Sequence, residues 1–196
     1  WKNPQRDNIW TLSQRRLLIV GLGTVGTEIA AMAKTFNLDI WGVQKTPAFH
    51  PICKKNFSFD ELDNLLPHVD IVCVTIPKEH KVPLLFMKQE IELLPRGSIL
   101  IILNSEDVID TQELLNAVDN DRFRGVLIDM KPSASPLKQK LWEHPKIVTT
   151  PRIAELPKMI PDTSFKDFRY NLRHYISGNT AEIKNVLSQD FCIHRS

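Results

Sequence analysis

The stretch Gly21-Leu22-Gly23-Thr24-Val25-Gly26 decides the fold of this chain. It directly follows an apolar run at residues 17–20 and begins a segment, residues 24–36, with apolar side chains at helical spacing. In a strand–turn–helix unit of this kind the first glycine permits the tight turn, and the second lets backbone N–H groups approach a pyrophosphate. The third lets the helix pack closely on the strand, and the helix N-terminus adds positive potential. The motif therefore predicts the phosphate-binding turn of a dinucleotide site.

Five further apolar runs of strand length follow the turn, at residues 40–43, 70–75, 98–103, 125–129 and 146–149. The runs are continuously apolar rather than alternating, which is typical of strands buried on both faces of a parallel sheet. Segments 58–66 and 110–118 are predicted helices, because each opens with a Ser or Asp cap that is followed three residues later by Glu. Strands that alternate with helices predict an α/β protein with a doubly wound parallel sheet, the Rossmann dinucleotide-binding fold, in a single domain.

We expect three parts along the chain: an entering arm at residues 1–13, the dinucleotide-binding domain at residues 14–160, and a C-terminal helix and tail at residues 161–196. The predicted core face of the domain's first helix comprises Val25, Ile29, Met32, Ala33 and Phe36. A last helix is predicted at residues 163–176, ending at Gly178. Its predicted core-packing stripe comprises Phe165, Phe168, Leu172 and Ile176.

Composition argues against several classes of partner. The formal net charge is only +2 and the basic clusters are short, so no nucleic-acid partner is expected. No apolar stretch approaches the ~20 residues of a membrane span, and the N-terminus lacks a signal-peptide pattern. Cys53, Cys73 and Cys192 form no CxxC motif and predict no metal site, which favours a reducing cytoplasm, with Cys73 as a buried thiol. Because residue 1 is Trp rather than Met, we expect a processed product or a piece of a longer protein.

The residue after the second strand is expected to select the cofactor. A carboxylate there would accept hydrogen bonds from the adenosine ribose hydroxyls, but this chain has Gln44, followed by Lys45 and Thr46. A neutral residue beside a lysine tolerates a 2′-phosphate, which makes NADP a candidate alongside NAD. Loss of nucleotide binding would also explain the missing carboxylate. NADP, NAD and no nucleotide are therefore all kept as alternatives.

Several other short sequence motifs follow the glycine turn in a characteristic order: Val74-Thr75-Ile76-Pro77, Leu94-Pro95-Arg96-Gly97-Ser98 and Val148-Thr149-Thr150-Pro151. With them the chain resembles the D-isomer-specific 2-hydroxyacid dehydrogenases, from about Trp10 to Gly178. The resemblance implies that Thr75 and Pro77 lie near the nicotinamide ribose and that Asp129 meets the nicotinamide carboxamide. It also implies a homodimer formed through the cofactor domain, and a substrate-facing N-terminal domain that is missing here.

The catalytic positions implied by the resemblance are altered. The family uses an arginine for the substrate carboxylate, a histidine for proton transfer and a glutamate that holds the histidine. Here Glu106 and Asp107 stand in the arginine segment, residues 131–136 contain no carboxylate, and Arg152 stands where the histidine belongs. A guanidinium stays protonated and cannot give and take a proton. His144 is expected to have a surface or capping role, and we predict no catalytic residue.

Three hypotheses follow. The chain is a catalytically lapsed relative that binds NAD(P) as a sensor, scaffold or subunit; or it is an oxidoreductase on 2-hydroxy or 2-oxo acids with a different acid–base set; or it is a nucleotide-free dimerisation module. The predicted cofactor-binding residues are Gly21, Gly23, Thr24, Val25, Gly26, Gln44, Lys45, Thr46, Thr75, Pro77, Asn104 (which precedes the altered loop) and Asp129.

Overall fold

The structure is a computed structural model, and it describes residues 10–47, 49–76, 83–103, 106–154 and 160–186. The chain divides into two compact units, Trp1–Ala154 and Glu155–Ser196. The predicted C-terminal part at residues 161–196 falls within the second unit, in which helix α6 (Ile160–Ile176) is the first described element. Residues 10–13 are the described part of the predicted arm, and there the guanidinium of Arg15 stacks 4.9 Å from the centre of the Trp10 ring.

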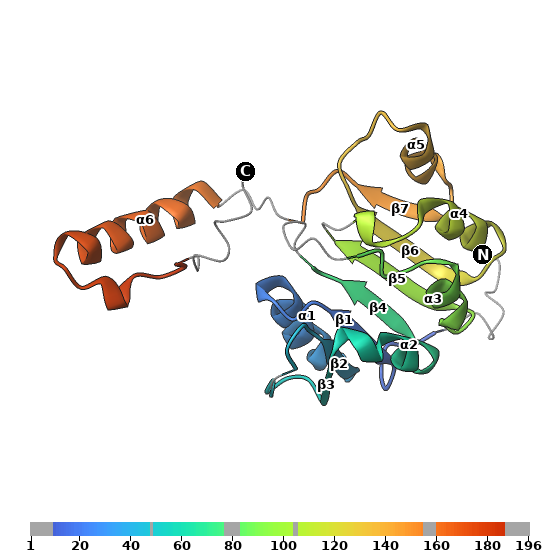
Figure 1. Cartoon of the computed structure of the whole chain (residues 1–196), viewed down its shortest axis with the longest axis horizontal. Coiled ribbons are helices and arrows are strands. Elements are labelled where there is room, and N and C mark those ends of the chain that lie inside the picture. Colours follow the sequence, from blue (N-terminus) through green and yellow to red (C-terminus); the bar gives the residue numbers. More distant parts are fainter. Residues whose placement is uncertain (1–9, 48, 77–82, 104–105, 155–159, 187–196) are drawn as a thin grey trace, which may run out of the picture. The chain divides into compact units, whose positions relative to one another are not determined.

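One seven-stranded parallel sheet forms the centre of the first unit, in the order β3-β2-β1-β4-β5-β6-β7 (Figure 1). Its strands are β1 (Arg16–Val20), β2 (Asp39–Val43), β3 (Lys55–Phe57), β4 (Ile71–Val74), β5 (Ser98–Leu103), β6 (Phe123–Asp129) and β7 (Ile147–Thr150). All six predicted runs form strands, and the predicted doubly wound α/β fold is confirmed. The prediction missed β3 because it is a three-residue edge strand that contains polar residues and pairs only with β2.

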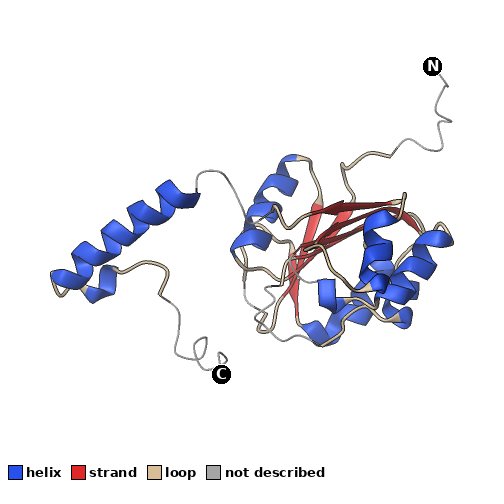
Figure 2. Ribbon diagram, turned by 90° about the horizontal axis from the view of Figure 1, so that it is seen from above, coloured by secondary structure: helices blue, strands red, loops and turns tan. Residues whose placement is uncertain are grey.

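Helices cover both faces of this sheet (Figure 2). One face carries α2 (Leu62–Leu65), α3 (Lys88–Leu93), α4 (Thr111–Asp119) and α5 (Pro136–Glu143), together with the short 3-10 helices η2 (Phe59–Glu61), η3 (Leu66–His68) and η4 (Glu106–Val108). Their side chains, such as Leu65, Leu114 and Leu141, share one core cluster with alternate strand residues. On the other face α1 (Thr24–Thr35) shares a second cluster with Ile19 and Cys73. Both faces are packed over β1, β2 and β4, which explains why these strands are continuously apolar. In β5 buried and partly buried residues alternate, and Val148 of β7 is 59% exposed.

The face of α1 that meets the sheet agrees only in part with the predicted one. Its buried residues are Gly26, Ala30 and Ala33, all of them small. Small side chains let the helix lie close to the strands. Of the predicted core face, Ala33 is buried and Ile29 is partly buried against the cluster, whereas three residues are exposed: Val25, Met32 and Phe36.

The second unit consists of α6 followed by the short 3-10 helix η5 (Thr180–Glu182). Asn171 joins them, because its side chain accepts a hydrogen bond from the Lys184 N–H and donates one to the Lys184 carbonyl, each 2.9 Å long. The helix ends before Gly178, which has φ +75° as the predicted stop requires. Within the described part of this unit, the side chains of the predicted core-packing stripe are exposed: Phe165 (64%), Phe168 (61%), Leu172 (42%) and Ile176 (76%). The core role of the stripe stays a prediction.

Candidate functional site

The carboxyl ends of the seven parallel strands lie at one edge of the sheet, and the order of connections reverses between β1 and β4. In open α/β sheets this reversal leaves a crevice in which ligands bind. The glycine turn leaves β1 at that point and is bonded to both neighbouring strands. The Gly21 N–H donates to the Val43 carbonyl of β2 at 2.8 Å, and the Thr75 N–H after β4 donates to the Val20 carbonyl at 2.9 Å. The turn is thus a fixed part of the sheet edge.

The three glycines of the turn meet different constraints. Gly21 has φ +105°, and a Cβ there would lie 3.1 Å from atoms of Thr75 and Ile76. Gly26 is buried, and its Cβ would lie 2.2 Å from the Gly21 carbonyl oxygen. Both predicted structural roles are confirmed. Gly23, in contrast, has φ −80°, and nothing lies within 4 Å of the place that a Cβ would take. Neither the backbone nor the packing requires a glycine at that position, and its missing side chain leaves open space.

The N-terminus of α1 is open to solvent beside this space. Gly23 is the N-cap residue and supplies no side-chain acceptor, and the first turn carries no acidic residue. Thr24 and Val25 are exposed. At the start of α4, by comparison, the Asp110 carboxylate accepts a hydrogen bond of 3.0 Å from the Glu113 N–H. The first N–H groups of α1 therefore lack a side-chain acceptor, and together with the helix dipole they suit a phosphate group.

Thr75 has a structural contact that the sequence did not predict. Its hydroxyl donates a hydrogen bond of 2.5 Å to the Gly21 carbonyl, and the side chain is only 8% exposed. The hydroxyl oxygen of Thr75 also lies 2.9 Å from the position that a Cβ on Gly26 would take. Thr75 therefore leaves no space for a side chain at Gly26. Thr75 thus holds the shape of the turn, and its contact with a nicotinamide ribose stays a prediction.

The other predicted residues lie along the same edge or outside the described part of the chain. Gln44 is half-buried just after β2, and its N–H donates to the Phe57 carbonyl at 3.1 Å. Lys45 and Thr46 follow it and are exposed. Pro77 and Asn104 lie outside the described residues. The structure therefore brings the residues after β2 beside the glycine turn.

His50 lies beside the glycine turn, although its place in the sequence gives no sign of this. Its Nδ1 accepts a hydrogen bond of 3.4 Å from the Ile52 N–H, which leaves the proton of the neutral ring on Nε2. Nε2 donates to the Thr27 hydroxyl of the first turn of α1 at 3.3 Å. The loop between β2 and β3 is thereby folded back onto the helix that starts at the glycine turn.

Gly42 in β2 is a second feature that the sequence did not explain. A Cβ there would lie 2.1 Å from the side chain of Leu22 and 2.8 Å from the Asn56 side-chain oxygen. The side chain of Leu22, between the first two glycines of the turn, therefore occupies the space that a side chain at Gly42 would need. A lone glycine inside a strand is the signal that could have indicated such a close approach.

The carboxylate of Asp129 organises the chain's own backbone at the end of β6. It is 1% exposed and accepts hydrogen bonds from the Ile153 N–H at 3.0 Å, the Ala154 N–H at 3.1 Å and the Thr150 hydroxyl. β4 and β5 separate β6 from β1, so Asp129 is about 14 Å along the sheet edge from the glycine turn. The predicted contact with a nicotinamide stays a prediction, and the observed role is to hold the segment after β7.

Arg152 lies in the segment that Asp129 holds. Its backbone has φ +53°, uncommon for a residue with a side chain, and its N–H donates to the Thr150 carbonyl at 2.9 Å. The Asp107 carboxylate accepts a hydrogen bond of 2.6 Å from Lys138 of α5, which ties the loop after β5 to that helix. The side chain of Glu106 lies outside the described part.

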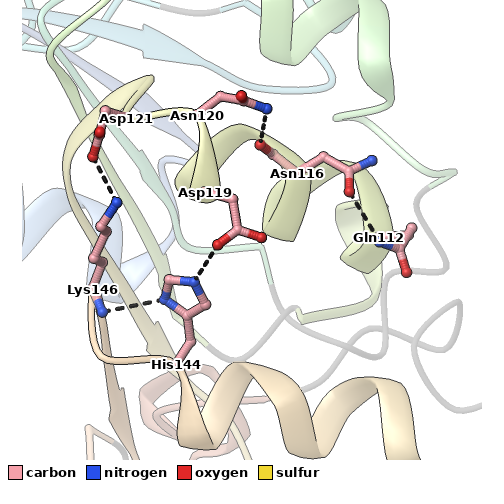
Figure 3. A network of polar contacts seen from close by, with 7 residues as sticks. All are labelled: Gln112, Asn116, Asp119, Asn120, Asp121, His144 and Lys146. Carbon is pink, nitrogen blue, oxygen red and sulfur yellow. Dashed lines mark hydrogen bonds and ion pairs between the residues drawn. The ribbon is translucent and has the colours of Figure 1, made fainter.

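His144 lies at the opposite edge of the sheet, before the amino end of β7. Its Nδ1 accepts a hydrogen bond of 3.2 Å from the Lys146 N–H, and its Nε2 donates to Asp119 at the end of α4 at 3.1 Å (Figure 3). Lys146 also pairs with Asp121 at 2.7 Å, and this contact lowers the pKa of the Asp121 carboxyl. His144 is the C-cap residue of α5, and its side chain joins the ends of α4 and α5. A histidine at this edge cannot replace one that belongs after β7.

The thiols of Cys53 and Cys73 are buried and unpaired. Burial raises the pKa of Cys73 to about 12 and that of Cys53 to about 11. Both thiols are therefore neutral at physiological pH, which confirms that Cys73 is a small hydrophobic residue of the core. Cys192 lies outside the described residues.

The family "D-isomer specific 2-hydroxyacid dehydrogenase, NAD binding domain" matches residues 1–154. The chain belongs to this family. The dehydrogenase match covers the whole first unit, from the entering arm to the segment held by Asp129. The resemblance and the cofactor class expected from the sequence are both confirmed.

Curated relatives and solved structures agree with the dehydrogenase family. D-3-phosphoglycerate dehydrogenase of Bacillus subtilis is 28% identical over 144 residues, which is 74% of this chain and 27% of that protein. Glyoxylate reductase of Pyrococcus horikoshii is 28% identical over 135 residues, 69% of this chain and 40% of that protein. The structure of a D-isomer specific 2-hydroxyacid dehydrogenase from Xanthobacter autotrophicus in complex with NADPH and MES matches with a TM-score of 0.75 and 23% identity, over 89% of this chain and 71% of that one. The chain thus spans less than half the length of these two curated relatives.

Proposed function

We propose that this chain binds a nicotinamide dinucleotide on the glycine turn and does not carry out the hydride transfer of its family. Gly23 carries the binding part of the proposal. The backbone conformation there suits any residue and the space around it is empty, so the fold itself gives no reason for a glycine. A pyrophosphate that approaches the first N–H groups of α1 does give one.

The segment after β7 supports the proposal that the chain does not carry out hydride transfer. Arg152 takes the position that the family resemblance gives to the proton-carrying histidine, and its charge is fixed at any accessible pH. His144, the histidine nearest to Arg152 in sequence, is hydrogen-bonded to Asp119 at the amino edge of the sheet. The segment at residues 131–136 offers no carboxylate to hold a catalytic histidine. A domain that keeps the dinucleotide-binding turn without the catalytic histidine and glutamate acts as a sensor, a scaffold or a subunit.

Calorimetric titration of the full chain with NADH and with NADPH tests the binding part. We expect saturable binding of at least one cofactor, and loss of that binding in Gly23→Val, because the branched side chain fills the space that a pyrophosphate needs. The fold of the variant is checked by circular dichroism. Absence of binding at millimolar concentrations of both cofactors would favour a nucleotide-free module and overturn the proposal.

Turnover measurements test the catalytic part. The full chain is incubated with NADH or NADPH and a panel of short 2-oxo acids, and cofactor oxidation is followed by absorbance. We expect rates at the background of a protein-free control. Reduction of any 2-oxo acid above that background would contradict the lapsed-enzyme proposal and would favour an oxidoreductase with a different acid–base set.

The assembly proposed here is a homodimer through the cofactor domain, joined to a substrate-facing domain in the whole protein and located in the cytoplasm. Support comes from apolar surface on the α1 side of the sheet, where Met32 is 58% and Phe36 is 56% exposed. The unpaired thiols of Cys53 and Cys73 suit a reducing compartment. Among the described residues no helix is long and apolar enough to cross a membrane. Light scattering after size exclusion should give the mass of two chains, and the mass of one would contradict the dimer.

A further inference from the structure

We propose that the cavity between α3 and α4 is a second binding site, which takes a small zwitterionic ligand of the amino-acid class. Arg96 binds the carboxylate of this ligand and Glu92 binds its ammonium group. The two helices belong to the core cluster on one face of the sheet, whereas the helix that begins at the glycine turn packs on the other face. The proposal therefore does not depend on the binding of a dinucleotide.

The cavity is large enough for such a ligand. Its volume is about 460 Å³, within the range of small-molecule sites. The side chains of Ile91 and Ala117 give it an apolar part, and charged and amide side chains supply the rest of the lining. This mixed lining suits a small polar molecule better than an apolar one.

The frame of the cavity is held by Arg122, which follows α4. Its guanidinium donates hydrogen bonds to the carbonyls of Ile91 at 2.7 Å and of Leu94 at 2.6 Å, and also to that of Glu92. In return, the Gly97 N–H donates to the Arg122 carbonyl at 2.7 Å. The end of α3 is thus fixed to the segment after α4. A site whose walls are already held loses little freedom when a ligand binds.

Four other charged side chains line the same cavity: Lys88, Glu92, Arg96 and Glu113. Two are cations and two are carboxylates, yet within the described part of the chain none of the four forms an ion pair with another residue. Their formal charges cancel. A ligand that carries one positive and one negative group complements such a lining, whereas a simple anion or cation would meet a like charge.

Two asparagines of α4 give the charged groups of the ligand further partners (Figure 3). The side-chain oxygen of Asn116 accepts a hydrogen bond of 3.0 Å from Gln112, so its amide N–H groups remain to donate to a carboxylate. The side-chain amide of Asn120 donates to the Asn116 carbonyl at 2.8 Å, so its oxygen remains to accept from an ammonium group. Both asparagines line the cavity together with Glu92 and Arg96.

The position of Arg96 brings these groups to one end of the cavity. Its Nη1 donates to the Asn120 carbonyl at 3.4 Å, a long bond that leaves its other N–H groups for a carboxylate. Arg122 bonds the carbonyl of Glu92, which places this residue beside the same end of α4. A cation, a carboxylate and the two amides are therefore close neighbours, as a molecule with adjacent ammonium and carboxylate groups requires.

NMR titration of the ¹⁵N-labelled full chain with the common amino acids, one at a time and without cofactor, tests the proposal. We expect at least one of them to cause saturable shifts of the side-chain amide signals of Asn116 and Asn120. Its N-acetyl derivative, which lacks the ammonium group, and the corresponding amine, which lacks the carboxylate, should each bind at least about tenfold more weakly.

Two outcomes of this titration would overturn the proposal. One is the absence of shifts with every amino acid at millimolar concentration. The other is equal affinity for the N-acetyl derivative, which would show a site for simple anions. Neither outcome bears on the proposed binding of a dinucleotide at the glycine turn.

Matched variants assign the binding to the cavity. Arg96→Gln and Glu92→Gln change exposed side chains, and each should weaken the binding of the amino acid at least about tenfold. Arg124→Gln and Glu28→Gln remove one charge of each sign from exposed residues outside the cavity lining and should leave the affinity unchanged. Wild-type affinity in both cavity variants would overturn the assignment, as would an equal loss in the two control variants.

Discussion

The hydroxyl of Thr75, after β4, donates a hydrogen bond of 2.5 Å to the carbonyl oxygen of Gly21, after β1. These two residues are 54 positions apart in sequence and adjoin the two strands between which the sheet order reverses. The bond closes one side of the glycine turn and fixes the direction of the Gly21 carbonyl. Gly26 packs against that carbonyl and against Thr75, so the three residues form one interlocked unit.

Removal of the Thr75 hydroxyl should therefore weaken both the fold and the site. Thr75→Val keeps the volume but leaves the Gly21 carbonyl without its donor in a place that is 8% exposed. We expect the free energy of unfolding to fall by about 1 kcal/mol in urea denaturation. Thr75→Ser keeps the hydroxyl and should lose less. Equal losses in the two variants would show that the methyl group, rather than the hydrogen bond, matters.

Substitutions at two glycines of the turn should differ in their effect on stability, because Gly26 is required by packing and Gly23 is not. In Gly26→Ala the new Cβ would lie 2.2 Å from the Gly21 carbonyl oxygen, and we expect a loss of roughly 1–3 kcal/mol of unfolding free energy. In Gly23→Ala the Cβ meets nothing within 4 Å, so the loss should stay below about 1 kcal/mol. Urea denaturation measures both. A larger loss in Gly23→Ala than in Gly26→Ala would contradict this account of the turn.

The buried carboxylate of Asp129 should contribute to the stability of the fold through its hydrogen bonds. Asp129→Asn replaces one acceptor oxygen by an amide that cannot accept from a backbone N–H, so one of the bonds from Ile153, Ala154 and Thr150 is lost. We expect a loss of roughly 2 kcal/mol in thermal or urea denaturation, together with faster amide exchange at Ile153 and Ala154. Asp119→Asn, at an exposed carboxylate, serves as the control and should change stability by well under half of that amount.

The raised pKa of Cys73 predicts a loss of stability at alkaline pH. Burial moves the pKa from its ordinary 9.0 to about 12, so above pH 9 the unfolded chain releases a proton that the folded chain keeps. The folded state is then favoured less as the pH rises, by up to about 1.4 kcal/mol for each pH unit between these two values. The contribution is fully present below pH 9. Denaturation at pH 8, 9 and 10 measures it.

Cys73→Ala provides the comparison for that prediction. The variant should be less stable than the wild type at pH 8, because it leaves a small cavity in the core, but its stability should fall less steeply between pH 9 and 10. Cys53 is present in both proteins and cancels from the difference. Parallel pH dependences in the two proteins would contradict the assignment to Cys73.

The glycine turn, the six strands of four or more residues and the family resemblance could all be predicted from local sequence. The reason is that a glycine pattern between a strand and a helix, and apolar runs of strand length, record constraints that act within a few residues. The same holds for the caps at Ser58 and Asp110, whose partners lie three residues away. Failures arose where a partner is distant in sequence. Val25, Met32 and Phe36 were wrongly assigned to the core face of α1, because hydrophobicity alone does not reveal how close the helix lies to the sheet.

By itself, then, the sequence determined the α/β class, the family and the position of the turn. Only the tertiary structure decided what Gly23 is for, since the demand for a glycine must be tested against φ and against the surrounding atoms. It also decided that Thr75 and Asp129 hold the chain's own backbone, and that His50 returns to α1. Each of these contacts joins residues more than 20 positions apart, and such contacts leave no periodic trace in the sequence because folding, not chain continuity, brings their atoms together.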